Sequence, residues 1–252
     1  MNRIIAIVNQ KGGVGKTTTA MNLAAGLAVL EKKTLLIDLD PQGNSSSGLG
    51  IDKDNLRNHI YQVIIGKAKI SDSITKTSID HLDIVPSNID LTGAEIELVK
   101  EFAREQKLKE ALKPISDDYE YIIIDCPPSL GLLSVNALTA CTDVLIPIQC
   151  EYYALEGVSQ LLNTIRLIQQ NLNPQLNVFG ILLTMFDKRL NLSNQVASEV
   201  RRYFKEQVFE TVISRNVKLS EAPSFGKSIF QYDIKSTGSQ NYLSLASEVV
   251  QR

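Results

Sequence analysis

A glycine-rich segment between a predicted strand and a predicted helix constrains this chain more than any other part of its sequence. Residues 10–19 read Gln-Lys-Gly-Gly-Val-Gly-Lys-Thr-Thr-Thr and follow an apolar run at residues 4–8. Apolar residues then recur at the spacing of one helix face from Met21 to Leu30. Glycines let backbone N–H groups approach an anion closely, and a helix N-terminus adds a favourable dipole. The order of strand, glycine turn and helix therefore predicts a phosphate-binding loop.

The segment fits most of the P-loop pattern, Gly-x-x-x-x-Gly-Lys-Ser/Thr. In that pattern Lys16 would reach the β- and γ-phosphates, and the Thr17 hydroxyl would contact Mg²⁺. Two positions depart from it, because Gln10 stands where the pattern has its first glycine and Lys11 adds a lysine inside the loop. The alternative is an ordinary glycine-rich turn between a strand and a helix. It does not explain why strand, glycine turn, Gly-Lys-Thr and helix occur together in this order. We therefore expect a nucleoside triphosphate and Mg²⁺ as ligands.

Apolar runs typical of buried parallel strands alternate with helical patterns along the chain. The predicted strands lie at residues 4–9, 34–38, 82–86, 121–125, 144–149, 179–185 and 208–213. Helical patterns lie at residues 155–169 and 192–203, and the charged segment 93–113 predicts an exposed helix. Residues 42–50, rich in Gly, Ser and Asn, predict a mobile loop. Together these patterns predict one doubly wound α/β domain over residues 1–252, a mostly parallel sheet with helices on both faces.

Composition narrows the class of protein further. The chain is 44% hydrophobic with a formal net charge of −2, and no apolar run approaches the ~18 residues of a membrane span. The first strand begins so early that we expect no signal peptide and no preceding DNA-binding domain. Cys126, Cys141 and Cys150 lack paired spacing, which favours a reduced, cytoplasmic setting. Residues 1–179 carry a net charge of −5 and residues 180–252 one of +3, which fits either an anionic partner or a solvated surface.

Carboxylates end two of the predicted strands, at the sheet edge where such folds bind ligands. Asp125 closes the apolar run 121–125, the Walker B pattern in which an aspartate helps to hold Mg²⁺. Asp38 and Asp40 follow the second strand in the same way. One of these two could orient the water that attacks the γ-phosphate, although Asp40-Pro41 is also typical of a turn.

Five segments together resemble the ParA/MinD family of ATPases with a deviant Walker A motif. They are residues 11–18, residues 38–44 (Asp-Leu-Asp-Pro-Gln-Gly-Asn), residues 124–129 (Ile-Asp-Cys-Pro-Pro-Ser), residues 151–157 and residues 215–224. The last two are similar to the chromosomal ParA branch, often called Soj, and the resemblance covers nearly the whole chain. It implies an ATP hydrolase of chromosome or plasmid partitioning, with weak intrinsic activity, ATP and Mg²⁺ as cofactors, and an ATP-dependent sandwich homodimer. It also implies non-specific binding to double-stranded DNA, release when a ParB-type partner stimulates hydrolysis, and a cytoplasmic, nucleoid-associated location.

The resemblance implies residue roles as well. Lys11 would be the signature lysine that reaches the partner subunit's ATP, with a solvated loop lysine as the alternative. Lys16 would act with it in catalysis, and Asp40 would position the catalytic water. The expected metal residues are Thr17, Asp38 and Asp125. The expected nucleotide contacts are Lys11, Gly12, Gly13, Val14, Gly15, Lys16, Thr17, Thr18, Thr184, Arg215 and Asn216, with Ser214 standing where relatives commonly have proline.

Basic residues of the C-terminal third are the candidates for DNA contacts. Arg189 and Lys218 lead, because both positions resemble places where the Soj branch carries basic residues used on DNA. Lys188 and Arg215 are lesser candidates. Scattered solvated charge is the alternative.

Two other branches share the ATP motifs. A MinD-like, membrane-cycling division-site ATPase would end in a basic amphipathic helix, and a reductase of the nitrogenase iron-protein type would need interface cysteines. Residues 241–252 hold one acidic and one basic residue, so we expect a helix docked on the core and no stable membrane association.

Overall fold

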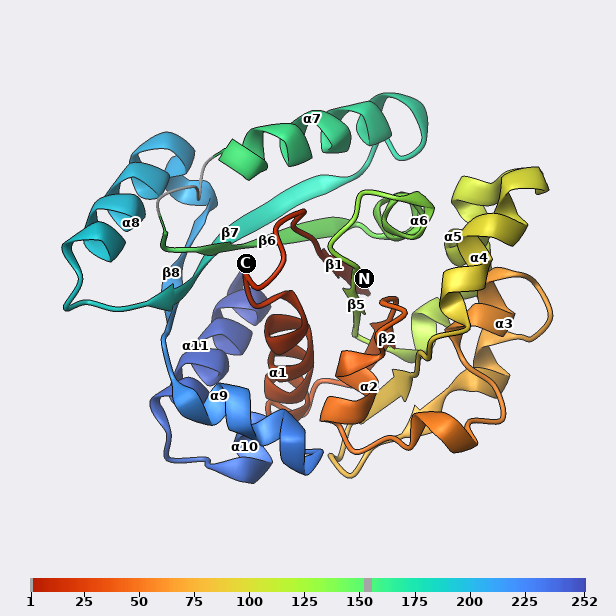
Figure 1. The fold of residues 1–252 in the computed structure, drawn as a ribbon, viewed down its shortest axis with the longest axis horizontal. Helices are drawn as coiled ribbons and strands as arrows, with labels where there is room; N and C mark the ends of the chain where they lie inside the picture. The colour runs from red at the N-terminus through yellow and green to blue at the C-terminus, as the bar shows by residue number, and fades with distance from the viewer. Residues whose placement is uncertain (1, 152–155) are drawn as a thin grey trace.

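A computed structural model describes residues 2–151 and 156–252. Its centre is an eight-stranded sheet in the order β3-β4-β2-β5-β1-β6-β7-β8 (Figure 1). The strands are β1 (Arg3–Ile7), β2 (Thr34–Asp38), β3 (Thr75–Lys76), β4 (Leu82–Val85), β5 (Tyr121–Asp125), β6 (Asp143–Gln149), β7 (Asn177–Phe186) and β8 (Val208–Ser214). All neighbouring pairs are parallel except β3 and β4. The predicted α/β fold with a mostly parallel sheet is confirmed.

Each predicted strand is present, and its ends differ from the predicted ones by at most two residues. No sequence pattern indicated β3, because two residues at a sheet edge are too short to show a periodicity.

Helices cover both faces of the sheet. The longer helices are α1 (Lys16–Val29), α6 (Leu132–Ala140), α7 (Glu156–Asn171), α8 (Asn191–Phe204) and α11 (Thr237–Gln251). Shorter ones are α2 (Asn44–Gly48), α3 (Ile60–Ile64), α4 (Leu91–Glu97), α5 (Lys107–Leu112), α9 (Val217–Glu221) and α10 (Ile229–Tyr232). Short 3₁₀ turns lie at Lys53–Asn55, Ile70–Ser73, Leu98–Lys100, Arg104–Gln106, Lys113–Asp118, Lys205–Gln207 and Ala222–Phe225.

The sheet separates two apolar cores. Ile5 and Ile7 of β1 pack with α1 and α11 on one face, and Ile4 and Ala6 pack with α3 to α8 on the other. This alternation is what a strand buried on both faces requires. Figure 1 shows α8 at one end of the long axis and α3, α4 and α5 at the other, with α9 and α10 below α11 on the lower side.

The prediction of a mobile loop over residues 42–50 was wrong. Residues Asn44–Gly48 form α2, and Ser45, Ser46 and Gly48 are buried. Ser45 and Ser46 are buried because their hydroxyls donate to the buried carboxylates of Asp125 and Asp38. Polar residues that are typical of a surface loop here form hydrogen bonds in the interior.

The prediction of one exposed helix over residues 93–113 was also wrong. The segment is divided between α4 and α5 with 3₁₀ turns between them, and Ala103 has a left-handed backbone with φ of 50°. Leu98, Leu108 and Leu112 are buried against the sheet. The high charge density concealed a narrow apolar face that was enough to dock both helices.

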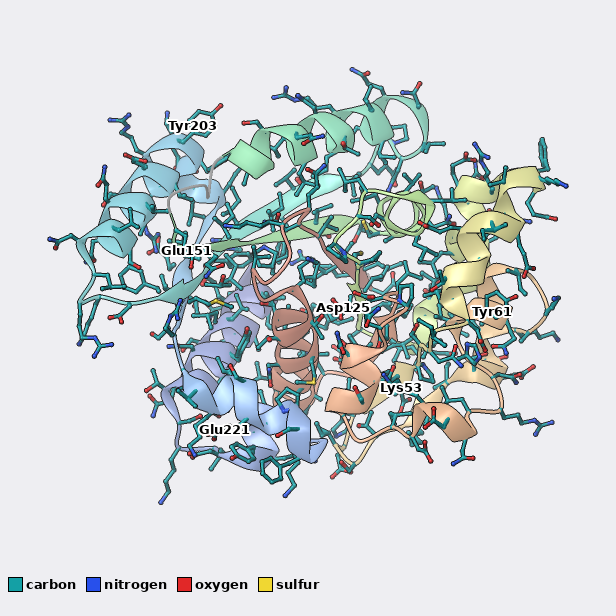
Figure 2. The ribbon with its side chains drawn as sticks, in the orientation of Figure 1. Lys53, Tyr61, Asp125, Glu151, Tyr203 and Glu221 are labelled. Carbon is teal, nitrogen blue, oxygen red and sulfur yellow. The ribbon has the colours of Figure 1, made fainter. Side chains whose placement is uncertain are left out.

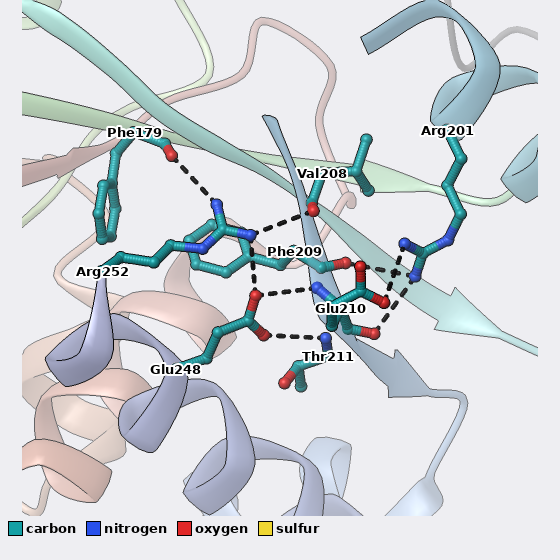
Figure 3. Close-up of polar contacts among 8 residues, drawn as sticks. All are labelled: Phe179, Arg201, Val208, Phe209, Glu210, Thr211, Glu248 and Arg252. Carbon is teal, nitrogen blue, oxygen red and sulfur yellow. Dashed lines mark hydrogen bonds and ion pairs between the residues drawn. The ribbon is translucent and has the colours of Figure 1, made fainter. Parts of the chain in front are cut away.

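The C-terminal helix is docked on the core, as predicted. Tyr242, Leu245 and Val249 are buried, and the end of α11 is fixed to the edge of the sheet (Figure 3). Glu248 accepts backbone hydrogen bonds from Glu210 and Thr211 of β8, each at 2.9 Å. No helix in the described part of the chain is long and apolar enough to cross a membrane.

The α7 and α8 predictions are confirmed with small shifts at their ends. Residue 155, the predicted start of the first helix, lies outside the described residues. Val158, Leu161 and Ile165 of α7 are buried, as the helical spacing predicted.

Candidate nucleotide-binding site

The glycine-rich loop joins β1 to α1 and leaves an open cradle. Gly13 and Gly15 adopt φ of +76° and +87°, where side chains with a Cβ are strained. A Cβ placed at Gly12, Gly13 or Gly15 would meet nothing within 4 Å. The backbone conformation therefore requires glycine at positions 13 and 15, and the space beside all three glycines is free for a ligand. The last of them, Gly15, is the N-cap of α1, and the N–H groups of a helix's first turn have no partners within the helix.

Lys16 lies at the start of α1 and folds back over the loop. Its Nζ donates to the Lys11 carbonyl at 3.1 Å, and the residue is 7% exposed. Burial lowers the pKa of the Lys16 ammonium, and the negative charges of Asp125 and Asp40 partly offset that effect. A buried cation at the mouth of an anion cradle is suited to bind phosphate.

Two buried carboxylates lie side by side next to the loop. Asp38 and Asp125 are register neighbours on the parallel strands β2 and β5, and both are fully buried. Burial raises the pKa of the Asp38 carboxyl. Burial, followed by the charge of Asp38, raises the pKa of Asp125, and the Ser45 and Thr17 hydroxyls partly offset the rise.

The Asp125 carboxylate is incompletely bonded. Its Oδ2 accepts from Ser45 Oγ at 2.8 Å, while Oδ1 is buried with no hydrogen-bond partner among the described residues. Figure 2 labels Asp125 near the centre of the molecule. Asp38 Oδ2, by contrast, accepts from the backbone N–H and the hydroxyl of Ser46 at 2.8 and 2.7 Å. A buried carboxylate oxygen without a donor fits a cation or a cation-bound water.

Mg²⁺ in nucleotide enzymes is held by one or two carboxylates, waters and the substrate's phosphates. The residues fit this mode, because Asp125 has a free oxygen and Thr17 lies beside it. Among the described residues, no group of three or more His, Cys, Asp or Glu could hold a metal by itself. Thr17, Asp38 and Asp125, the predicted metal residues, lie close together. Because they do not form a complete ligand set, the remaining ligands would have to come from nucleotide and water.

Asp40 sits on the rim of the same site. It is 8% exposed, and its Oδ1 accepts the Gln42 backbone N–H at 2.9 Å, which is the turn geometry that Asp-Pro predicts. Its charge reaches both Lys16 and Asp125. The turn and a position facing the phosphates are thus compatible.

A second pocket opens beside the loop, where a base could lie. It is lined by Gly15, Thr18, Thr184, Met185, Ile213, Ser214, Arg215, Asn216, Leu219, Ser220 and Tyr242. Thr184 is 2% exposed and donates to the Val14 carbonyl at 2.9 Å, so its hydroxyl supports the loop. The Asn216 side chain accepts from the Lys218 backbone N–H at 2.8 Å and caps α9. The predicted contacts are brought together here, although two of their side chains already have protein partners.

Lys11 projects from the loop and forms an ion pair in its own chain. Its Nζ lies 3.7 Å from Glu151 Oε2, and Arg215 Nη2 lies 3.9 Å from Glu151 Oε1. The rest of the segment that resembles the Soj branch at 151–157 includes residues 152–155, which lie outside the described residues.

The DNA candidates lie on the segments that follow β7 and β8. Lys188, Arg189 and Arg215 line one hollow between the end of β7 and the end of β8, and Lys218 follows on α9. Arg215 lines both this hollow and the base pocket. The two predicted surfaces are therefore adjacent.

Sequence reasoning missed Ser45, Ser46 and Glu151. The two serines belong to a run of three, Ser45–Ser47, whose only signal was loop-like composition. Glu151 begins the segment 151–157 that resembles the Soj branch, but its contacts to Lys11 and Arg215 depend on tertiary structure and were not predicted.

Comparison with known proteins places this site in a family. A sequence family described as an AAA domain matches residues 2–178. The chromosome partitioning protein ParA of Myxococcus xanthus is 59% identical over all of this chain and 89% of its own length. The sporulation initiation inhibitor protein Soj of Bacillus subtilis is 57% identical over 99% of this chain and 98% of its own. The chain belongs to the ParA/Soj family of P-loop ATPases.

Solved structures agree with this assignment. A Mycobacterium smegmatis protein described as cobyrinic acid a,c-diamide synthase, with bound ADP and magnesium, has a TM-score of 0.88. It is 38% identical over 100% of this chain and 95% of its own. The cell division ATPase MinD of Pyrococcus furiosus has a TM-score of 0.83 and is 27% identical over 100% of this chain and 99% of its own. The predictions of family, fold and ATP-hydrolysing class are confirmed, and the nucleotide and magnesium in the first structure agree with the expected cofactors.

Proposed function

We propose that residues 1–252 act as one ATPase domain of a DNA-partitioning system, which binds ATP with Mg²⁺ and dimerises around it. The observation that carries this proposal is the pairing of an open glycine cradle and buried Lys16 with a buried, incompletely bonded Asp125. An anion site and a cation site in direct contact fit a Mg²⁺–triphosphate. The metal, when bound, would neutralise charge that develops on the phosphates.

Each residue of the site has a role under this proposal. The loop N–H groups and Lys16 hold the phosphates, and Thr17 and Asp125 hold the metal side. Asp38 already accepts from Ser46 through Oδ2 and from the Asp40 backbone N–H through Oδ1. It would therefore act by keeping Asp125 and bound water in place. Asp40 would orient the attacking water, because it is anchored by its own turn at the rim of the site.

Lys11 would complete the site of a second subunit. Two facing triphosphates repel each other, and one cation from each subunit would offset that repulsion, so dimerisation would depend on ATP. The contact between Lys11 and Glu151 is long and about half-exposed, so it costs little to break.

The dimer would bind double-stranded DNA without sequence preference through Arg189 and Lys218, helped by Lys188 and Arg215. Lys188, Arg189 and Arg215 line one hollow and Lys218 follows three residues later on α9, which supports a phosphate-binding surface. A ParB-type partner would stimulate hydrolysis and so release the dimer. The protein would therefore be cytoplasmic and associated with the nucleoid.

The fixed position of α11 argues against the MinD-like alternative. Its apolar face is buried in the core, and Arg252 donates to the carbonyls of Phe179 and Val208 at 3.4 and 3.1 Å. A membrane-binding tail would need that face to be free.

Sedimentation velocity with and without ATP tests the proposal. We expect a monomer with ADP, a dimer with ATP and Mg²⁺, and co-sedimentation of the dimer with duplex DNA but not with anionic liposomes. A monomer in all nucleotide states, or ATP-dependent binding to liposomes alone, would overturn it. Lys16→Ala provides the control that removes ATP binding.

A further inference from the structure

The leading DNA candidate, Arg189, is held by a carboxylate of its own chain. Its Nε donates to Asp187 Oδ1 at 2.9 Å, and its Nη2 donates to Oδ2 at 2.7 Å. This bidentate pair uses two of the five guanidinium donors and is the strongest geometry of an arginine–carboxylate contact. The Arg189 side chain is 82% exposed, whereas that of Asp187 is 12% exposed. The cation thus lies on the surface, and the anion lies beneath it.

The other candidates share this feature. Lys218 Nζ lies 3.1 Å from Glu221 Oε2, which also accepts from Tyr232 Oη at 3.0 Å (Figure 2 labels Glu221 on α9). Arg215 lies 3.9 Å from Glu151. Lys188 forms no ion pair in the part of the chain that the structure describes. Three of the four candidate cations therefore face a carboxylate within 4 Å.

Such pairing weakens a phosphate-binding surface. Affinity for DNA comes from protein cations that replace the counterions on phosphates. A cation that is already paired with a carboxylate of its own chain adds little affinity when it contacts a phosphate. A phosphate must either displace the carboxylate or bind beside it against its repulsion. A protomer with paired cations should consequently bind DNA weakly.

We propose that Asp187 and Glu221 mask Arg189 and Lys218, so that one protomer binds DNA too weakly to remain on it and stable binding requires two. This inference rests on the proposed DNA binding and adds its regulation. With two protomers on one rigid surface, the second set of phosphate contacts forms at high effective concentration, so weak sites suffice in the dimer. Masking would make ATP-dependent dimerisation the condition for DNA binding.

Asp187 offers the cleaner test of the two carboxylates. Its Oδ1 also accepts the Arg189 backbone N–H at 3.0 Å, which closes the loop. Asp187→Asn keeps an oxygen for that turn, and it removes the charge and one of the two oxygens that accept from the Arg189 guanidinium. The Arg189 guanidinium lowers the pKa of Asp187 to about 2, so no ordinary change of pH removes the charge in the wild type.

The experiment measures fluorescence anisotropy of labelled duplexes of unrelated sequence, with ADP and with ATP, at 50 and 200 mM salt. We expect Asp187→Asn to bind DNA more tightly in both states and to bind measurably in ADP, where the proposed function expects a weakly binding monomer. The logarithm of DNA affinity falls with the logarithm of salt concentration with a slope of about −0.9 for each phosphate that the protein neutralises. For each additional phosphate that the variant neutralises, the loss of affinity between 50 and 200 mM salt should therefore be about 3.5-fold larger.

Glu210→Gln is the matched control. Glu210 pairs with Arg201 at 3.6 Å (Figure 3), forms no ion pair with a candidate cation among the described residues, and its replacement gives the same change in net charge. It should leave DNA binding close to wild type. In the double variant Asp187→Asn/Arg189→Gln the increase in affinity should disappear, because masking acts through Arg189.

The possible outcomes separate this inference from the proposed function. Unchanged or weaker binding by Asp187→Asn, or an equal increase in Glu210→Gln, overturns masking. Wild-type protein that binds no DNA in ATP refutes the proposed function. Asp187→Asn then still decides the inference, because tighter binding through Arg189 supports masking and its absence refutes it.

Discussion

Replacement of Asp125 by Asn should stabilise the nucleotide-free protein while removing its Mg²⁺-dependent ATP binding. Asp38 and Asp125 are register neighbours on adjacent strands, which lie about 4.8 Å apart. Two unit charges about 5 Å apart repel by roughly 3 kcal/mol at an effective dielectric constant of ~20. Relief of the whole repulsion in a protein of this size would raise the Tm by about 6–12 °C, which is an upper bound.

The stabilisation should depend on pH in a defined direction. Burial raises the pKa of both carboxyls, so the folded protein binds protons more tightly than the unfolded chain. Stability then falls as the pH rises above about 4, the ordinary range of a carboxyl. The advantage of Asp125→Asn should be small near pH 4–5 and grow toward pH 8 and above, because the pKa of Asp125 is raised to about 8 and its charge appears only as the pH approaches that value.

Thermal unfolding at pH 5 and pH 8, followed by circular dichroism in EDTA, tests this reasoning. Asp117→Asn, which changes an exposed aspartate, is the control and should show no such pH-dependent stabilisation. Isothermal titration with Mg²⁺ and ATP should show that Asp125→Asn has lost most of its affinity. A variant that is less stable than wild type at pH 8, or that binds Mg²⁺–ATP normally, would refute the reasoning.

Three further substitutions separate the steps of the proposed cycle. Lys16→Ala should abolish ATP binding, and near-normal affinity by titration would contradict its role. Asp40→Ala should bind ATP and remain a dimer without turnover, and hydrolysis at the wild-type rate would remove it from the catalytic site. Lys11→Ala should bind ATP but fail to form the productive dimer. Normal ATP-dependent dimerisation in sedimentation would return it to the solvated-loop interpretation.

Much of this architecture could be predicted from the sequence because its strands are continuous apolar runs. β2 and β5 were predicted to the residue, and the glycine loop and its carboxylates follow from the order of motifs. These signals are local, since the periodicity and the motif lie within a few residues of one another. Figure 1 shows the parallel sheet and two helical layers that they imply.

The errors arose where tertiary contacts reverse a local preference. Ser45 and Ser46 have the composition of a loop, yet they are buried because Asp125 and Asp38 need donors. The carboxylates that hold Arg189 and Lys218 lie two and three residues away in sequence. Charge patterning alone did not indicate that those ion pairs would form, because a nearby carboxylate can equally well point to solvent.

Under the proposed function, ATP converts this protein from a weak DNA binder into a strong one through dimerisation. Anisotropy of fluorescent duplexes of unrelated sequence, titrated with protein in ATP and in ADP at several salt concentrations, tests it most directly. We expect tight binding in ATP that is independent of sequence, falls steeply with salt, and is reduced with a shallower salt slope in Arg189→Glu and Lys218→Glu. Equal affinity in ATP and ADP, or no loss in either variant, would contradict it.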